Sequence, residues 1–294
     1  MIKEFIKNIS KDIIGNEFKI KISLATILSG GHILIEDLPG TGKTTFAKAL
    51  TNSMNLKFKR IQFTSDLLPS DILGYTFLKD NKFEINKGPI FTNIVLGDEL
   101  NRASPKTQSA FLEAMEEKTV TIDKETFELP EPFCVIATQN PSDLSGTSLL
   151  PETQLDRFTI SFALDELTNE QQTNLLKNYS SEDMNKNNSI DINDLLKKDD
   201  VNIDDKVYQY ILSIKQFINK NFPEIHVSTR CLKQIVSLSK SLVILNEKNY
   251  VTYQDIKDII PYILKHRINI VEKNKVLNFV NEEIINKIDL PDDQ

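Results

Sequence analysis

The stretch from Ile33 to Leu50, ILIEDLPGTGKTTFAKAL, constrains the fold more than any other part of this chain. A short apolar run is followed by a turn rich in proline and glycine, and then by apolar residues at helical spacing, so the order strand, loop, helix is predicted. Glycines let the backbone wrap closely, and the amides at a helix N-terminus attract phosphate. The stretch therefore predicts a phosphate-binding loop. Its candidate nucleotide-binding residues are Pro39, Gly40, Thr41, Gly42, Lys43, Thr44 and Thr45.

Two side chains of this loop have the chemistry that a nucleoside triphosphate needs. The Lys43 ammonium can bind the β- and γ-phosphates, and the Thr44 hydroxyl can coordinate Mg²⁺. The full pattern G-x-x-x-x-G-K-[ST], called Walker A, has glycine where this chain has Asp37. Aspartate tolerates left-handed backbone, and the phosphate-binding amides belong mainly to residues 39 to 44, so we expect a competent loop with altered geometry at its first residue. The alternative is a glycine-rich turn before an ordinary helix.

A pair of carboxylates follows another apolar run, Ile94 to Gly97. Asp98 and Glu99 stand where this predicted strand ends, so Asp98 can hold Mg²⁺ while Glu99 polarises the attacking water. A third buried strand, 133 to 137, is followed by Asn140, whose amide can sense the γ-phosphate or position water. The alternative reading of the two carboxylates is a solvated acidic pair at a strand end.

Length and composition favour a globular protein of two domains. The chain has 294 residues, 40% of them hydrophobic, and no apolar run approaches the roughly 20 residues of a membrane span. No secretory signal opens the sequence, so we expect a cytoplasmic protein without a membrane span. The net charge of −7 argues against nucleic acid as a partner. Neither the two cysteines nor the three histidines have disulfide or metal-site spacing, so both cysteines are predicted to be inert core thiols and each histidine structural.

Two segments have the pattern of β-hairpins that project from the core, one within residues 75 to 91 and one within 119 to 129. Residues 116 to 128 hold five acids and two lysines, a net charge of −3, which makes the second hairpin unsuited to nucleic acid. Arg157 precedes an alternating strand at 158 to 162. On sequence alone this arginine is equally well explained as a local ion-pair partner.

The rest of the chain is predicted to be helical apart from one acidic segment. Apolar stripes at helical period predict a small bundle after residue 207, with Ser228 and Thr252 as helix N-caps. The segment 180 to 205 is polar with a net charge of −5, and we expect it to be the loosest part of the fold. Ile13 and Ile14, upstream of the loop, are candidates for an adenine pocket. Core packing explains them equally well.

Six stretches occur in an order that resembles the MoxR family of AAA+ ATPases, and the likeness spans nearly the whole chain. They are EDLPGTGKTTFAKAL, GPIFTNIVLGDELNRASPKTQSAFLEAMEE, LPEPFCVIATQNP, LLPETQLDRF, HVSTRCL and YVTYQDIKDIIPYILKHRI. The resemblance implies an α/β fold: an AAA+ nucleotide-binding core with a parallel central sheet at residues 1–163, and an all-α lid domain at 164–294. The two hairpins correspond to inserts that mark this branch. Lys124 stands where the family usually has a turn glycine.

The resemblance also implies roles for individual residues. The phosphate loop would bind ATP or ADP, and Asp98 and Glu99, the Walker B pair, would bind Mg²⁺ and activate water. Asn140 resembles the first sensor residue. Arg157, in LDRF, resembles the arginine finger that reaches a neighbour's ATP, and Arg230, in VSTRC, resembles the lid sensor of the γ-phosphate.

The resulting functional hypothesis is an ATP-hydrolysing ring, a hexamer, that remodels a protein partner. In this family the partner is often a protein with a von Willebrand factor A domain. A second hypothesis is a nucleotide-gated scaffold that binds partners with little turnover. A third is a nucleic-acid motor, which the acidic charge balance disfavours.

Overall fold

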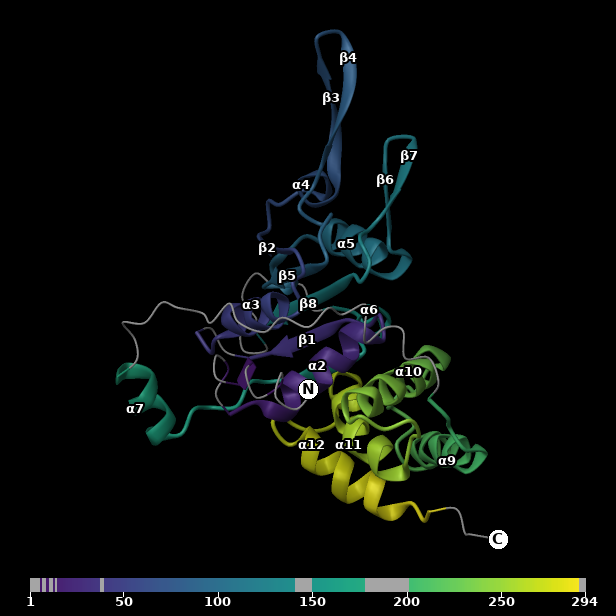
Figure 1. Cartoon of the computed structure of the whole chain (residues 1–294). Helices are drawn as coiled ribbons and strands as arrows, with labels where there is room; N and C mark the ends of the chain where they lie inside the picture. Colours follow the sequence, from purple (N-terminus) through teal and green to yellow (C-terminus); the bar gives the residue numbers. More distant parts are fainter. Residues whose placement is uncertain are drawn as a thin grey trace.

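The computed structural model describes residues 15–37, 40–140, 150–177 and 201–290, together with Ile6, Ile9, Ser10 and Ile13. Most of residues 1 to 14 and of the acidic segment 180 to 205 lies outside these described residues. Figure 1 shows a central sheet with a helical bundle on one side, while two hairpins project in the opposite direction. No helix within the described ranges combines the length and the apolar character needed to cross a membrane.

The central sheet has five parallel strands in the order β2, β5, β8, β1, β9. Parallel pairing brings the carboxyl ends of all five strands to one edge, which is where the predicted loop and carboxylates follow. The predicted parallel-sheet α/β fold is confirmed. The strands are β1 (Ile33–Glu36), β2 (Phe58–Gln62), β5 (Ile94–Asp98), β8 (Cys134–Gln139) and β9 (Ile160–Phe162).

Both faces of the sheet are buried, which explains why its inner strands read as continuous apolar runs. Side chains alternate along β1: Ile33 and Ile35 belong to one hydrophobic cluster, and Leu34 belongs to the other. The second cluster lies between the sheet and α5, with Phe63 and Phe111 stacked edge to face at 5.0 Å. Strands β1, β5, β8 and β9 are therefore packed from both sides, whereas the edge strand β2 buries only Ile61 fully.

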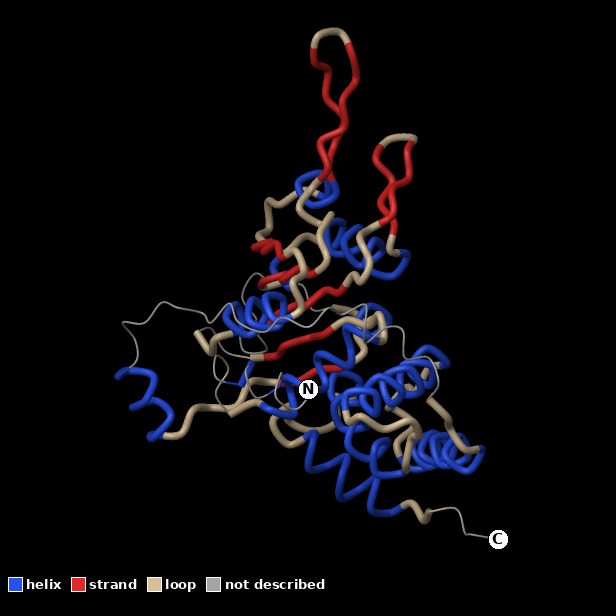
Figure 2. The backbone as a smooth tube through the Cα atoms, viewed as in Figure 1, coloured by secondary structure: helices blue, strands red, loops and turns tan. Residues whose placement is uncertain are grey.

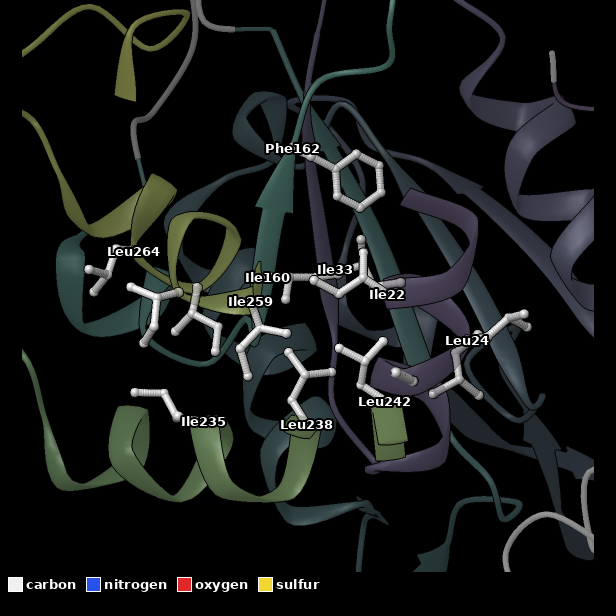
Figure 3. Packing of buried hydrophobic residues seen from close by; sticks show 14 of the residues in the cluster. Ile22, Leu24, Ile33, Ile160, Phe162, Ile235, Leu238, Leu242, Ile259 and Leu264 are labelled. Carbon is white, nitrogen blue, oxygen red and sulfur yellow. The ribbon is translucent and has the colours of Figure 1, made fainter. Parts of the chain in front are cut away.

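The first cluster joins the sheet to the C-terminal bundle. Figure 3 shows Leu238 and Leu242 of α10 beside Ile22 of α2 and Ile259 of α11. Helix α2 is buried on most of its circumference because it lies between sheet and bundle. The predicted N-caps are confirmed: Ser228 Oγ accepts from Cys231 N at 3.0 Å and Thr252 Oγ1 from Asp255 N at 3.2 Å. The principal helices are α2 (Glu17–Leu28), α3 (Lys43–Ser53), α4 (Pro69–Leu73), α5 (Pro105–Glu117), α6 (Glu152–Leu155), α7 (Asn169–Lys177), α9 (Asp205–Asn221), α10 (Thr229–Leu245), α11 (Tyr253–Leu264) and α12 (Val276–Phe279).

The two predicted hairpins form as separate two-stranded sheets, visible as paired red strands in Figure 2. The first consists of β3 (Gly74–Lys79) and β4 (Lys82–Lys87), the second of β6 (Thr119–Ile122) and β7 (Glu125–Glu128). Asp80 and Asn81 both have positive φ, 47° and 58°, as a tight two-residue turn requires. In the second turn Asp123 takes the positive φ, 54°, so Lys124 does not need the backbone freedom of a glycine.

A buried arginine joins the bundle to the core. The Arg267 side chain, only 4% exposed, donates from Nε to Asp156 Oδ1 at 3.0 Å and from a terminal amino group to Phe158 O at 3.2 Å. The same amino group donates to Gln234 Oε1 of α10 at 2.7 Å. These contacts fix the position of the lid relative to the segment that carries Arg157.

Replacing Arg267 with alanine is expected to lower the free energy of unfolding by about 3–5 kcal/mol, because it leaves the Asp156 carboxylate without its buried partner. Urea denaturation followed by circular dichroism measures the change. Lys275→Ala is the control, since its 2.8 Å pair with Glu272 is largely exposed and its loss should cost at most about 1 kcal/mol. Equal small losses in the two variants would contradict the structural role of Arg267.

Candidate nucleotide-binding site

The phosphate loop joins β1 to α3, as predicted. Gly40 and Gly42 have φ of 84° and 89°, values that other residues adopt only with strain. Gly42 occupies the N-cap position of α3 and, being glycine, has no side chain to cap the first turn. A Cβ atom added at either glycine would meet no atom of the described residues within 4 Å, its chain neighbours aside, so the space beside each glycine is open with respect to this part of the chain. A helix N-terminus that begins at a glycine with open space beside it fits a phosphate group.

The side chains of this loop lie around that helix start. Lys43 Nζ donates to the Asp37 carbonyl oxygen at 3.0 Å, across the loop. Thr44 is half-buried in the first turn, and Thr41 and Thr45 are exposed. Pro39 lies outside the described residues. Residues 40 to 45 are therefore arranged as the sequence predicted, and their contacts with nucleotide stay a prediction.

Asp37 does not need the backbone freedom of the glycine that it replaces. Asp37 is not among the described residues that have a positive φ. Its main-chain N–H donates to Gln139 O at 3.2 Å, and its carboxylate accepts from Leu164 N at 3.2 Å. Aspartate at this position thus ties the loop to the segment after β9.

Asp98 and Glu99 follow β5 and are organised by a residue of the adjacent strand β8. The Thr138 hydroxyl donates to Asp98 Oδ1 at 2.6 Å and accepts from the Glu99 N–H at 2.9 Å. Glu99 has a φ of 58° in the left-handed region, which is strained for a residue with a side chain. One hydroxyl therefore holds the Asp98 carboxylate and the strained backbone of Glu99 together.

Strand β2 supplies further contacts to the same two carboxylates. Gln62 Nε2 donates to Glu99 Oε2 at 2.8 Å, and Arg60 donates to Asp98 Oδ2 at 2.5 Å. Arg102 also donates to Glu99 Oε2, at 3.0 Å. Arg60 and Gln62 are two residues apart, so they lie on one face of β2. Both carboxylates are thus held by cations or amides.

The chemistry of these groups fits Mg²⁺ as well as phosphate. Hard oxygen ligands, here the Asp98 carboxylate and the Thr44 hydroxyl, are what Mg²⁺ prefers. Asn140 follows β8, which lies between β5 and β1 in the sheet, so its main chain stands between the carboxylates and the loop. Three of the predicted stretches therefore meet at the carboxyl edge of the sheet.

Arg157 and Arg230 lie at the opposite edge. Arg157 precedes β9, whose residue Ile160 pairs with Ile33 at the start of β1, while the phosphate loop follows the end of β1. Arg157 Nε forms an ion pair with Glu116 Oε2 at 2.9 Å, and Arg230 forms one with Glu116 Oε1. The fold therefore brings the two arginines together but does not bring them to the loop of their own chain.

The predicted adenine pocket is placed only in part. Ile13 is 7% exposed and belongs to the hydrophobic core, as its alternative reading expected, and Ile14 lies outside the described residues. A cavity of about 580 Å³ lies next to this segment. Its lining includes Gly15, Phe18 and, from the lid, Tyr262. We keep an adenine site here as a proposal.

The cysteines and two of the histidines are structural. His32 donates from Nε2 to Met115 O at 3.0 Å, and its Nδ1 accepts from Val135 N at 3.0 Å. Burial, with a contribution from the Lys118 charge, lowers the pKa of His32 to about 3. Burial also lowers the pKa of His266 and raises the pKa of both thiols. Among the described residues no cluster of three His, Cys, Asp or Glu could hold a metal ion.

Sequence reasoning missed the residues that position the carboxylates. Gln62 ends β2 and Thr138 is the penultimate residue of β8, which was a usable signal, whereas Arg60 lies in the middle of β2, and assigning all three requires the strand order. Glu116 was equally hard to single out, because Glu117 follows it directly and Glu113 precedes it by one helical turn.

Comparison with known proteins agrees with this architecture. Residues 32–160 match the family model for the ATPase family associated with various cellular activities (AAA), and residues 216–288 match the AAA lid domain. Uncharacterized protein YeaC of Bacillus subtilis is 37% identical over 98% of this chain and 93% of its own length. Chaperone MoxR1 of Mycobacterium tuberculosis is 29% identical, covering 98% of this chain and 80% of its own. The crystal structure of a candidate ATPase from Cytophaga hutchinsonii has a TM-score of 0.86 and 34% identity, covering 99% of this chain and 95% of that one.

These relatives cover the sheet, the hairpins and the lid together, so the likeness is not confined to the phosphate loop. The matches to an AAA model and a lid model confirm the predicted AAA+ core with C-terminal helices. This chain belongs to the MoxR family of AAA+ ATPases.

Proposed function

We propose that this protein is a Mg²⁺-dependent ATPase that works as a homo-oligomeric ring, a hexamer, and remodels a partner protein. The observation that carries the proposal is the convergence of the phosphate loop, the Asp98–Glu99 pair and Asn140 at the carboxyl ends of neighbouring strands. In open α/β sheets, ligands bind at this edge. The proposed domains are a core at 1–163 and a lid at 164–294.

The residues at this edge divide the reaction between them. The loop amides and Lys43 bind the phosphates, and Thr44 and Asp98 hold Mg²⁺, which neutralises charge on the phosphate oxygens. Glu99 accepts the proton of the attacking water, and Asn140 positions that water or senses the γ-phosphate. Thr138 fixes Asp98 and Glu99 relative to each other.

The position of Arg157 and Arg230 in the fold supports the assembly of several copies into a ring. Because Arg157 and Arg230 lie at the edge away from their own loop, they reach an ATP only if a second copy presents its loop to them. A head-to-tail interface of this kind forms a closed ring when repeating the rotation between neighbouring copies returns to the first copy. The hexameric state is taken from the family resemblance.

The identity of the protein partner is the least specific part of the proposal. A homologue is named Chaperone MoxR1, which supports a chaperone-like action on other proteins. The resemblance suggests a partner with a von Willebrand factor A domain, met in the cytoplasm. The projecting β3–β4 hairpin, with Phe83 80% exposed, is available for such contacts.

One observation favours the second candidate, a nucleotide-gated scaffold. The Glu99 carboxylate is held by Gln62 and Arg102, so its action as a base on water requires these contacts to rearrange. If they persist with ATP bound, the protein would bind partners with little hydrolysis.

Lys43→Ala tests the nucleotide site. Loss of a charge-assisted contact worth about 1.5–3 kcal/mol should weaken ATP binding about 10- to 150-fold. Fluorescent ATP-analogue titration measures the affinity, and phosphate release measures turnover. Lys48→Ala, an exposed lysine on the same helix, should leave both unchanged. Wild-type affinity in Lys43→Ala would show that the loop is not the phosphate site.

A further inference from the structure

One carboxylate holds both of the arginines that lie at the far edge. Glu116, in the last turn of α5, contacts Arg157 of the core through Oε2 and Arg230 of lid helix α10 through Oε1. The side chains of Glu116, Arg157 and Arg230 are 31%, 26% and 41% exposed, so all three are partly accessible to solvent. Glu116 therefore sets the spacing between the two guanidinium groups.

The contact with Arg157 engages only one side of its guanidinium group. Glu116 Oε2 lies 2.9 Å from Nε, an ion-pair distance without the geometry of a hydrogen bond. A guanidinium presents its donors in a fixed planar fork. The ion pair at Nε therefore holds the Arg157 guanidinium beside Glu116 by charge, and the terminal amino groups are the donors that would meet a phosphate.

The second carboxylate nearby is already occupied. Asp156 accepts from Arg267 at 3.0 Å and from the Ser228 hydroxyl at 2.8 Å, and its distance to Arg230 is 3.6 Å. Glu116 is thus the principal anionic contact of the Arg157–Arg230 pair.

The charge around this pair suits a polyanion. A cavity of about 160 Å³ is lined by Glu116 and three cations, Lys118, Arg157 and Arg230. One carboxylate against three cations leaves a local excess of positive charge on a chain whose net charge is −7. A terminal phosphate supplies the missing negative charge.

We propose that Glu116 is a positioning residue, which presents Arg157 and Arg230 as a preset pair to the terminal phosphate of ATP bound by a neighbouring copy. The proposal rests on the ring ATPase proposed above. Because α5 begins six residues after Glu99, the pair is anchored to the helix that follows the chain's own catalytic carboxylate. Misplacing a group by about 1 Å can cost roughly 100-fold in rate, so the spacing matters.

Glu116→Gln tests the proposal by steady-state ATP hydrolysis above the assembly concentration. We expect kcat to fall about 10- to 100-fold while KM stays unchanged, because the residues that bind ATP lie at the other edge of the sheet. Glu117→Gln is the matched control, one residue further along the same helix, and should keep wild-type kcat. In a background that carries both Arg157→Ala and Arg230→Ala, Glu116→Gln should cause no further loss, because Glu116 acts through these two arginines.

Two outcomes separate this inference from the proposed function. If Arg157→Ala is inactive but Glu116→Gln matches Glu117→Gln, the positioning role is wrong and the ring ATPase stands. If Arg157→Ala keeps wild-type turnover, the arginine finger fails and Glu116 has nothing to position. Mixing Glu116→Gln protein with Glu99→Gln protein is the control for misfolding. Recovered turnover shows that the Glu116→Gln copies fold and receive intact arginines from their neighbours.

Discussion

Glu99→Gln is expected to reduce ATP turnover about 10²- to 10⁴-fold while ATP still binds with wild-type affinity. Glutamine has the shape of glutamate but cannot accept the proton of the attacking water. Its carbonyl oxygen can still accept from Gln62 and Arg102, which both contact Oε2 of Glu99, so the local structure should persist. Single-turnover phosphate release and fluorescent ATP titration measure the two effects separately.

The control for this variant is Glu113→Gln, an exposed residue of α5 that should keep full turnover. Full turnover in Glu99→Gln would remove Glu99 from the mechanism. A partner complex that survives unchanged in Glu99→Gln, beside a wild type that barely hydrolyses ATP, would instead favour the nucleotide-gated scaffold.

The positions of the phosphate loop and of the Asp98–Glu99 pair at the sheet edge could be predicted from sequence because local patterns encode them. A glycine-rich turn between a strand and a helix has few other readings, and carboxylates that end an apolar run stand at a sheet edge. The strands themselves could be predicted because both faces of the sheet are buried, which makes each inner strand a short continuous apolar run.

The supporting residues could not be predicted because they depend on which strands are neighbours. Thr138 meets Asp98 only because β8 lies beside β5, and Gln62 meets Glu99 only because β2 lies on the other side of β5. The burial of α2 has the same origin, since α2 packs against the lid helix α10, which is distant in the sequence. Local propensity contains no information about such long-range pairings.

Two interpretations of Arg157 are open from the sequence, a local ion-pair partner and an arginine finger, and the structure contains an observation that bears on each. Arg157 does pair locally with Glu116, and a partly exposed ion pair contributes at most about 1 kcal/mol to stability. It also lies at the edge opposite its own phosphate loop, where a neighbour's ATP could reach it. An arginine finger supplied in trans is worth about 10³ to 10⁵ in rate.

Arg157→Ala is therefore expected to reduce turnover about 10³- to 10⁵-fold, with thermal stability changed by at most about 1 kcal/mol. Wild-type turnover per protomer should rise with protein concentration as the ring assembles, and the variant should stay low at every concentration. Arg157→Lys keeps the charge but loses the planar fork, so it should recover only part of the rate.

Mixing inactive variants decides whether the arginine acts between copies. Arg157→Ala copies have an intact Glu99, and Glu99→Gln copies have an intact arginine, so neighbours in a mixed ring complete each other's sites. In a random equal mixture about a quarter of all sites combine an intact glutamate with an intact neighbouring arginine, so about a quarter of wild-type turnover should return. If the mixture stays inactive, or if turnover in Arg157→Ala falls no more than its stability explains, Arg157 is a local ion-pair partner and the ring loses its main physical support.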